Sequence, residues 1–140
     1  MHTPEPITGT ILLIDRDERL PKERATLEAA GFSVVTATTA AEGLALAQQM
    51  TPDLVVADVL LEKPDAGFVL AYELKQDPAL ATVPLVLLSS AFQQHGIVFD
   101  LNSPEGRQWI KADLYLDRPV PPERLVSKIR ALLLHRHAAA

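Results

Sequence analysis

Three continuous apolar runs constrain the fold of this chain more than any other feature of its sequence. They are residues 11–14, which stop at Asp15, residues 54–57, which stop at Asp58, and residues 85–88, which stop at Ser89. A strand with one face in water alternates apolar and polar residues, whereas a strand covered on both faces is apolar throughout. The runs therefore predict buried strands of a parallel sheet.

Helical patterns separate these runs. The other expected elements are helices at about 19–30, 40–50, around 68–72 and from about 121 onward, and short strands at 32–36 and 114–116. Pro21 suits the first turn of the first helix, and Thr39 suits the N-cap of the second. Strands that alternate with helices predict an α/β fold, with a doubly wound five-stranded parallel sheet and helices on both faces.

The length of 140 residues suits one domain. Residues 1–9 contain two prolines and a glycine and are expected to form a flexible arm, and residues 10–140 are expected to form the domain. Residues 91–112 read as an extended segment with a short helix at about 105–110, and loops of this length are usually functional or mobile. The last helix ends the chain, so we expect no attached output domain.

Composition excludes several classes of function. The sequence has no cysteine, which rules out disulfides and thiol chemistry. A net charge of −5 argues against binding to nucleic acid or to an anionic membrane. No apolar run approaches the roughly 20 residues of a membrane span, and no signal peptide is evident. The expected location is the cytoplasm.

Polar residues follow the predicted strands and indicate a site. Asp15, Asp58, Ser89 and Arg118 each come just after a strand. Each alone could be an ordinary loop residue. In an open α/β sheet, however, ligands bind at the carboxyl ends of the strands. Two carboxylates, a hydroxyl and a cation at that edge could together bind a divalent metal and a phosphoryl group.

At these positions the chain resembles the receiver domains of two-component response regulators. The stretches that carry the resemblance are ILLIDRDERL (11–20), PDLVVADVLLEKPDAGF (52–68), VPLVLLSS (83–90) and ADLYLDRPVPPERL (112–125). It extends over about residues 10–134. It implies the flavodoxin-like receiver topology and a phosphorylation switch, in which a histidine kinase or a phosphotransfer protein donates a phosphoryl group to Asp58.

The resemblance also implies roles for the neighbours of Asp58. Asp15 and the backbone carbonyl of Leu60 would help Asp58 to hold Mg²⁺. Ser89 and Arg118 would contact the phosphoryl oxygens. Tyr115 matches the family's switch aromatic, although half-buried packing in the sheet would explain this residue equally well.

Arg16 is the main departure from the family pattern, because receivers normally have a second metal-binding acid at this position. An arginine cannot ligate a metal, and its charge repels one. Arg16 could pair with Asp58 and occupy the place of the metal. Alternatively, it could turn into solvent while Asp17 or Glu62 helps to rebuild the metal site. The sequence leaves both alternatives open.

Two further departures concern geometry. Arg118 replaces the family's lysine, so a planar fork takes the place of a compact ammonium group. The loop after Asp58 is one residue longer than usual, and the segment between Ser89 and Arg118 is extended. Both features resemble a subgroup with a D-V-x-L-E loop and a tryptophan before the fifth strand, a position that Trp109 fits.

The favoured function is a stand-alone, non-enzymatic receiver that binds an output partner protein according to the phosphorylation of Asp58. The alternative is a pseudo-receiver that acts without phosphate as an interaction or homodimerisation module, because Arg16 removes a metal-binding acid. A small flavodoxin-like or phosphatase-like enzyme would need a phosphate-binding loop or a dedicated acid/base pair beside Asp58, and the sequence shows neither.

Overall fold

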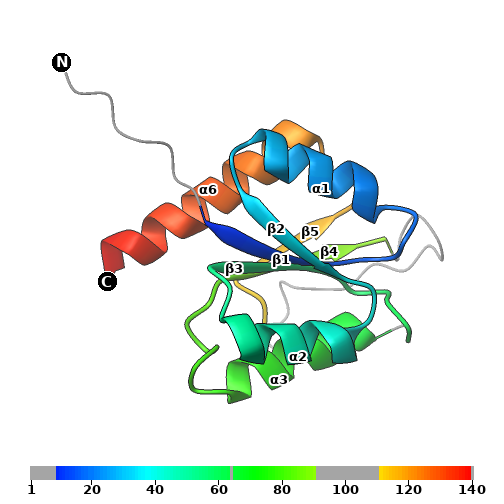
Figure 1. Ribbon diagram of the computed structural model, residues 1–140, viewed down its shortest axis with the longest axis vertical. Coiled ribbons are helices and arrows are strands. Elements are labelled where there is room, and N and C mark those ends of the chain that lie inside the picture. The colour runs from blue at the N-terminus through cyan, green and yellow to red at the C-terminus, as the bar shows by residue number, and fades with distance from the viewer. Residues whose placement is uncertain (1–8, 64, 91–110, 140) are drawn as a thin grey trace.

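The computed structural model describes residues 9–63, 65–90 and 111–139, and these residues form a single parallel sheet flanked by helices (Figure 1). The strand order is β2-β1-β3-β4-β5. The strands are β1 (Thr10–Ile14), β2 (Ser33–Ala37), β3 (Leu54–Asp58), β4 (Leu85–Ser89) and β5 (Leu114–Asp117). The predicted doubly wound α/β fold is confirmed.

The described helices cover the sheet in two layers. They are α1 (Leu20–Ala29), α2 (Ala40–Met50), α3 (Ala66–Gln76) and α6 (Pro122–Ala139). Helices α1 and α6 lie on one face of the sheet, and α2 and α3 lie on the other (Figure 1). None of the described helices combines the length and apolarity that crossing a bilayer requires.

Alternate residues of the central strands pack into opposite layers. Ile11 and Leu13 belong to the apolar cluster that includes residues of α1 and α6. Leu12 and Ile14 belong to the cluster that includes residues of α2 and α3. All four side chains are fully buried. Burial on both faces is the reason that the strand is apolar at every position.

The boundaries of α1 and α2 and the start of α6 agree with the prediction to within one residue, whereas α3 extends beyond the expected range of about 68–72 at both ends. The hydroxyl of Thr39 accepts a hydrogen bond of 3.1 Å from the backbone N–H of Glu42, which confirms it as the N-cap of α2. Pro21 lies in the first turn of α1. Gly31 follows that helix at φ 100°, a conformation that favours glycine. The arm at residues 1–8, the helix expected at 105–110 and Trp109 lie outside the described residues.

Two carboxylates bind the amino ends of the strands, at the edge opposite the candidate site. Asp53 Oδ2 accepts a hydrogen bond of 2.8 Å from the N–H of Thr10 at the start of β1. Asp113 Oδ2 accepts bonds from the N–H of Leu85 (2.8 Å) and from Lys75 Nζ (2.9 Å). These bonds satisfy backbone N–H groups at the amino ends of β1 and β4. Asp113 also joins α3 to β4, because it binds both Lys75 and Leu85.

Helix α2 lies so close to β1 at Gly43 that a Cβ atom there would force the side chain of Ile14 to shift. A Cβ atom at Gly43 would collide with Cδ1 of Ile14, whose side chain is fully buried and cannot move into solvent. The same close approach sets the distance between α2 and the strand that ends at Asp15.

Gly43→Ala is therefore expected to lower the free energy of unfolding by up to about 2 kcal/mol. Overpacking costs about 1–3 kcal/mol, and it outweighs the gain of about 1 kcal/mol in helix propensity. Ile14→Val removes the colliding Cδ1, so the double variant should lose less stability than the two single variants added together. Chemical denaturation measures all three. Strictly additive losses would contradict the collision.

Candidate functional site

The carboxyl ends of four strands bring the predicted polar residues to one edge of the sheet. Asp15 follows β1 and Asp58 ends β3, and each is only 1% exposed. Ser89 ends β4 and is fully buried. Arg118 follows β5, and its N–H donates a hydrogen bond of 2.9 Å to the carbonyl of Ser89. The sheet itself therefore aims Arg118 at the two aspartates.

The guanidinium group of Arg118 binds three carboxyl groups. Its Nε donates to Asp58 Oδ2 at 3.0 Å, and its Nη2 donates to Asp15 Oδ2 at 2.8 Å and to Glu23 Oε1 at 3.0 Å. Burial alone would lower the pKa of Arg118, but the charges of Glu23 and Asp15 outweigh burial, and its pKa is raised. The group is thus a permanent cation inside the site, with only 13% of its side chain exposed.

A second guanidinium group comes from Arg19, immediately before α1. Its Nη1 lies 3.2 Å from Asp58 Oδ2 and 3.4 Å from Asp15 Oδ1, with 22% of the side chain exposed. Sequence reasoning did not identify this residue. The spacing of four residues from Asp15 was the available signal, because side chains at i and i+4 meet where the chain turns into a helix. Two cations therefore bridge the same two aspartates.

The second carboxylate oxygen of Asp58, Oδ1, also has hydrogen-bond partners. Oδ1 accepts a hydrogen bond of 2.7 Å from the N–H of Leu60 and lies 3.4 Å from Ser90 Oγ. Burial raises the pKa of Asp58, against the opposing effects of the Leu60 N–H and of Arg118. Leu60 was expected to contribute its carbonyl to a metal, and Ser90 was not singled out from the sequence.

The loop after Asp58 is pressed against the start of α3. The N–H of Gly67 donates a hydrogen bond of 3.0 Å to the carbonyl of Val59. A Cβ at Gly67 would lie 2.5 Å from both the Asp58 carbonyl oxygen and the Cα of Val59. Any larger residue would push this backbone away, so Gly67 holds the end of β3 in place.

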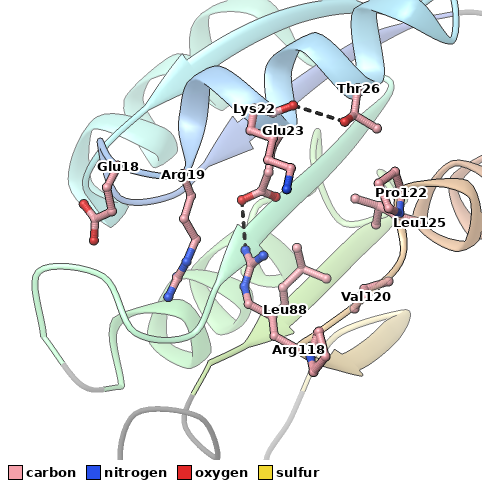
Figure 2. Close-up of a pocket in the computed structure, with 11 residues that line it drawn as sticks. Glu18, Arg19, Lys22, Glu23, Thr26, Leu88, Arg118, Val120, Pro122 and Leu125 are labelled. Carbon is pink, nitrogen blue, oxygen red and sulfur yellow. Dashed lines mark hydrogen bonds and ion pairs between the residues drawn. The ribbon is translucent and has the colours of Figure 1, made fainter.

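Glu23, on α1, is the third carboxyl group around Arg118 (Figure 2). Its Oε2 is buried and has no hydrogen-bond partner among the described residues while the group is ionised. Burial raises the pKa of Glu23 to about 8, and a hydrogen bond with Asp15 acts in the same direction. At neutral pH the carboxyl group therefore mostly retains its proton, which gives it a hydrogen to donate to Asp15.

Tyr115 on β5 lies at the edge of the site. Its ring stacks on Phe68 of α3, with the ring centroids 6.5 Å apart and the planes 10° from parallel. Burial raises the pKa of Tyr115 to about 12, although hydrogen bonding with Ser89 opposes the shift. Ser89, the predicted phosphoryl contact, and Tyr115, the predicted switch aromatic, thus interact with each other.

Arg16, Asp17 and Glu62 lie around an open hollow beside the site. Arg16 is 40% exposed, and its Nη1 is 4.0 Å from the carboxylate of Glu18. Glu62 accepts the N–H of Ala40 at 2.9 Å with both of its oxygens, at the start of α2. The cations that the structure places against Asp58 are Arg19 and Arg118.

The donor set does not fit a divalent metal as it stands. Asp15 and Asp58 are the carboxylates expected to ligate Mg²⁺, and both are engaged by guanidinium groups. Arg16 replaces the third acid. Nowhere in residues 9–63, 65–90 and 111–139 do three carboxylate or imidazole groups gather as a metal ion would require.

A cavity of about 300 Å³ opens next to Arg118, between α1 and the segment that follows β5 (Figure 2). Leu88 and Leu125 contribute apolar surface to it, and Lys22 and Thr26 line it from α1. The hydrogen bond between Arg118 and Glu23 therefore lies at the wall of a cavity rather than in a closed core.

Residues 11–130 match the response regulator receiver domain family. The DNA-binding dual master transcriptional regulator RpaA of Synechocystis sp. is 34% identical over 124 residues, which are 88% of this chain and 48% of RpaA. Protein PilH of Pseudomonas aeruginosa is 28% identical over 123 residues, which are 88% of this chain and 95% of PilH. The chain spans about half the length of the first curated relatives that it matches.

Solved structures share the fold. A CheY-like response regulator receiver domain protein of Methanospirillum hungatei superposes with a TM-score of 0.75 at 25% identity, covering 96% of this chain and 100% of that one. The receiver domain of the sensor histidine kinase PA1611 of Pseudomonas aeruginosa, solved with magnesium coordinated in its active-site cleft, gives a TM-score of 0.74 at 18% identity. It covers 91% of this chain and 98% of its own.

The raised pKa of Glu23 predicts a pH-dependent stability. The ordinary value is 4.5 and the folded value is about 8, so the folded state holds this proton more tightly than the unfolded state does. The contribution of Glu23 is fully present below about pH 4.5 and is lost as the pH rises through 8, with a slope of up to about 1.4 kcal/mol per pH unit. Glu23→Gln keeps an oxygen for Arg118 and a donor for Asp15 but does not titrate.

We therefore expect the free energy of unfolding to fall more steeply between about pH 5 and pH 8 in the wild type than in Glu23→Gln. Urea denaturation across this pH range measures both curves. Glu28→Gln, at an exposed position of the same helix, is the matched control and should follow the wild type. Parallel curves for the wild type and Glu23→Gln would contradict the prediction.

Proposed function

Because the chain belongs to the response regulator receiver family, we propose that Asp58 accepts a phosphoryl group and thereby changes the binding of a partner protein. The donor is the phosphohistidine of a histidine kinase or of a phosphotransfer protein in the cytoplasm. The observation that carries the proposal is the position of Asp58, a buried carboxylate at the end of β3 with Arg118 Nε at 3.0 Å.

The transfer needs a nucleophile and positive charge. One carboxylate oxygen of Asp58 attacks phosphorus, the P–N bond to the donor histidine breaks, and the imidazole leaves with the bonding electron pair. Negative charge on the transferring group is stabilised by fixed donors, which Arg118 and Arg19 supply. Ser90 Oγ, at 3.4 Å from Asp58 Oδ1, is placed to donate to a phosphoryl oxygen.

The charge of the product drives the switch. An acyl phosphate on Asp58 has more negative charge than the carboxylate that it replaces, and it adds strong acceptor oxygens. Arg118 would be drawn from Asp15 and Glu23 toward these oxygens. Because Ser89 interacts with Tyr115, a hydroxyl drawn toward the phosphoryl group would also change the environment of the Tyr115 ring and its stacking on Phe68.

Magnesium belongs to the chemistry of receiver domains in general, as the PA1611 structure illustrates. In this chain the expected ligands Asp15 and Asp58 are already paired with cations, and Arg16 stands in place of the second acid. We therefore propose that phosphorylation of Asp58 depends only weakly on Mg²⁺. The two guanidinium groups supply the charge instead.

The second candidate function is that of a pseudo-receiver, which binds a partner or a second copy of itself without phosphate. The closed pairing of both aspartates with Arg19 and Arg118 favours it, because the site is charge-satisfied before any phosphoryl group arrives. Both functions use the same fold and differ only in whether Asp58 reacts.

Intact mass after incubation with a small phosphodonor separates the two functions. We expect the wild type to gain the mass of one phosphoryl group, because Asp58 combines a nucleophile with adjacent cations. The gain should be abolished in Asp58→Asn. Asp65→Asn, the same change at an exposed aspartate of the following loop, is the matched control and should label like the wild type. No gain in the wild type, with or without Mg²⁺, would sink the phosphoacceptor proposal and favour the pseudo-receiver.

A further inference from the structure

Two guanidinium groups converge on one oxygen of Asp58. Arg19 Nη1 lies at 3.2 Å and Arg118 Nε at 3.0 Å from Oδ2. Each group also reaches Asp15, Arg19 at Oδ1 and Arg118 at Oδ2. The two aspartates are therefore bridged twice, once from the start of α1 and once from the end of β5.

Arg118 was expected at this place, and Arg16 was one of two alternatives, whereas Arg19 was not expected and is the additional cation. A divalent metal shared by Asp15 and Asp58 would compete with Arg19 for their carboxylate oxygens, because hard cations bind such oxygens directly and Arg19 contacts one oxygen of each aspartate. It would also meet the charge of the guanidinium group at close range. Arg19 thus blocks the metal by position and by charge.

The charges of the two aspartates are matched by two guanidinium groups without a metal. Asp15 and Asp58 supply two negative charges, and Arg19 and Arg118 supply two positive charges. Without Arg19, the two aspartates and Arg118 would together have a net negative charge. Asp15 Oδ1 and Asp58 Oδ2 would each lose one hydrogen-bond donor.

Arg16 is less well placed for this role. Its side chain is 40% exposed and its guanidinium lies beside Glu18, although its backbone N–H donates to Asp15 Oδ1 at 2.7 Å. The backbone bond does not depend on the side chain. Replacing the Arg16 side chain would therefore leave the pairing of Asp15 and Asp58 with Arg19 and Arg118 in place.

We infer that Arg19 is a built-in counter-cation that occupies the place of the divalent metal, and that its guanidinium group is what excludes Mg²⁺ from Asp15 and Asp58. The inference deepens the proposed function, since the same cation would face a phosphoryl group on Asp58. It concerns metal binding, however, and can be tested without any phosphodonor.

Arg19 can be replaced without dismantling the fold. It stands at the N-cap of α1 but makes no side-chain capping bond there, and its backbone N–H bonds to the carbonyl of Arg16. Arg19→Gln keeps length and polarity and removes the charge. Arg24→Gln is the matched control. Arg24 lies on α1, is half exposed, and forms a surface salt bridge with Glu28.

The experiment measures Mn²⁺ binding by electron paramagnetic resonance, with Mg²⁺ as competitor, on the full chain. We expect Arg19→Gln to bind Mn²⁺ at least about tenfold more tightly than the wild type, because a dication no longer meets a cation between the aspartates. Arg24→Gln and Arg16→Gln should stay within about twofold of the wild type. Adding Asp58→Asn to Arg19→Gln should abolish the gain, which would locate the ion at this site.

Three results would overturn the inference. They are equal affinities of wild type and Arg19→Gln, a gain in Arg16→Gln without one in Arg19→Gln, and a gain in Arg19→Gln that persists in the double variant. Circular dichroism of Arg19→Gln confirms that the protein tested is folded. If the wild type never accepts a phosphoryl group but Arg19→Gln gains the ion, then the proposed function fails and the role of Arg19 stands.

Discussion

The Arg118 guanidinium group is the interaction on which the site depends. It joins Asp15, Asp58 and Glu23, which come from β1, β3 and α1, and it lies with them in a largely buried region. A buried carboxylate is expensive unless a cation and hydrogen bonds compensate for the lost water. Two buried aspartates can therefore remain side by side only because cations bridge them. The same bridges determine what else the site can bind.

The topology of the sheet brings these charged side chains together. Parallel strands place all their carboxyl ends at one edge, and the bond from the Arg118 N–H to the Ser89 carbonyl fixes the last strand against its neighbour at that edge. Gly67 brings α3 against the backbone after Asp58. The backbone thus determines where the charged groups meet, and the identity of each side chain determines the sign of its charge.

The sequence predicted the fold well because burial on both faces leaves a plain pattern, the apolar runs that stop at Asp15, Asp58 and Ser89. It also placed those residues and Arg118 at one edge. It did not predict the roles of Arg19 and Glu23. Their long side chains reach the site from the start of α1 and from α1 itself, and the sequence pattern there predicts a helix but not where its polar side chains point. The family pattern pointed to Arg16, because receivers normally have an acid at that position. The guanidinium group that contacts Asp58 alongside Arg118 belongs instead to Arg19, three positions later.

The raised pKa of Glu23 bears on how the proposed phosphorylation could open such a closed site. Arg118 must leave some of its carboxyl partners if it is to meet a phosphoryl group. Abandoning a buried carboxylate would leave an unpaired charge, whereas abandoning a buried carboxylic acid leaves only a neutral polar group, at a much smaller cost. Because the pKa of Glu23 is about 8, this partner is mostly the acid at neutral pH. Glu23 therefore positions Arg118 in the resting state without holding it as tightly as an ionised carboxylate would.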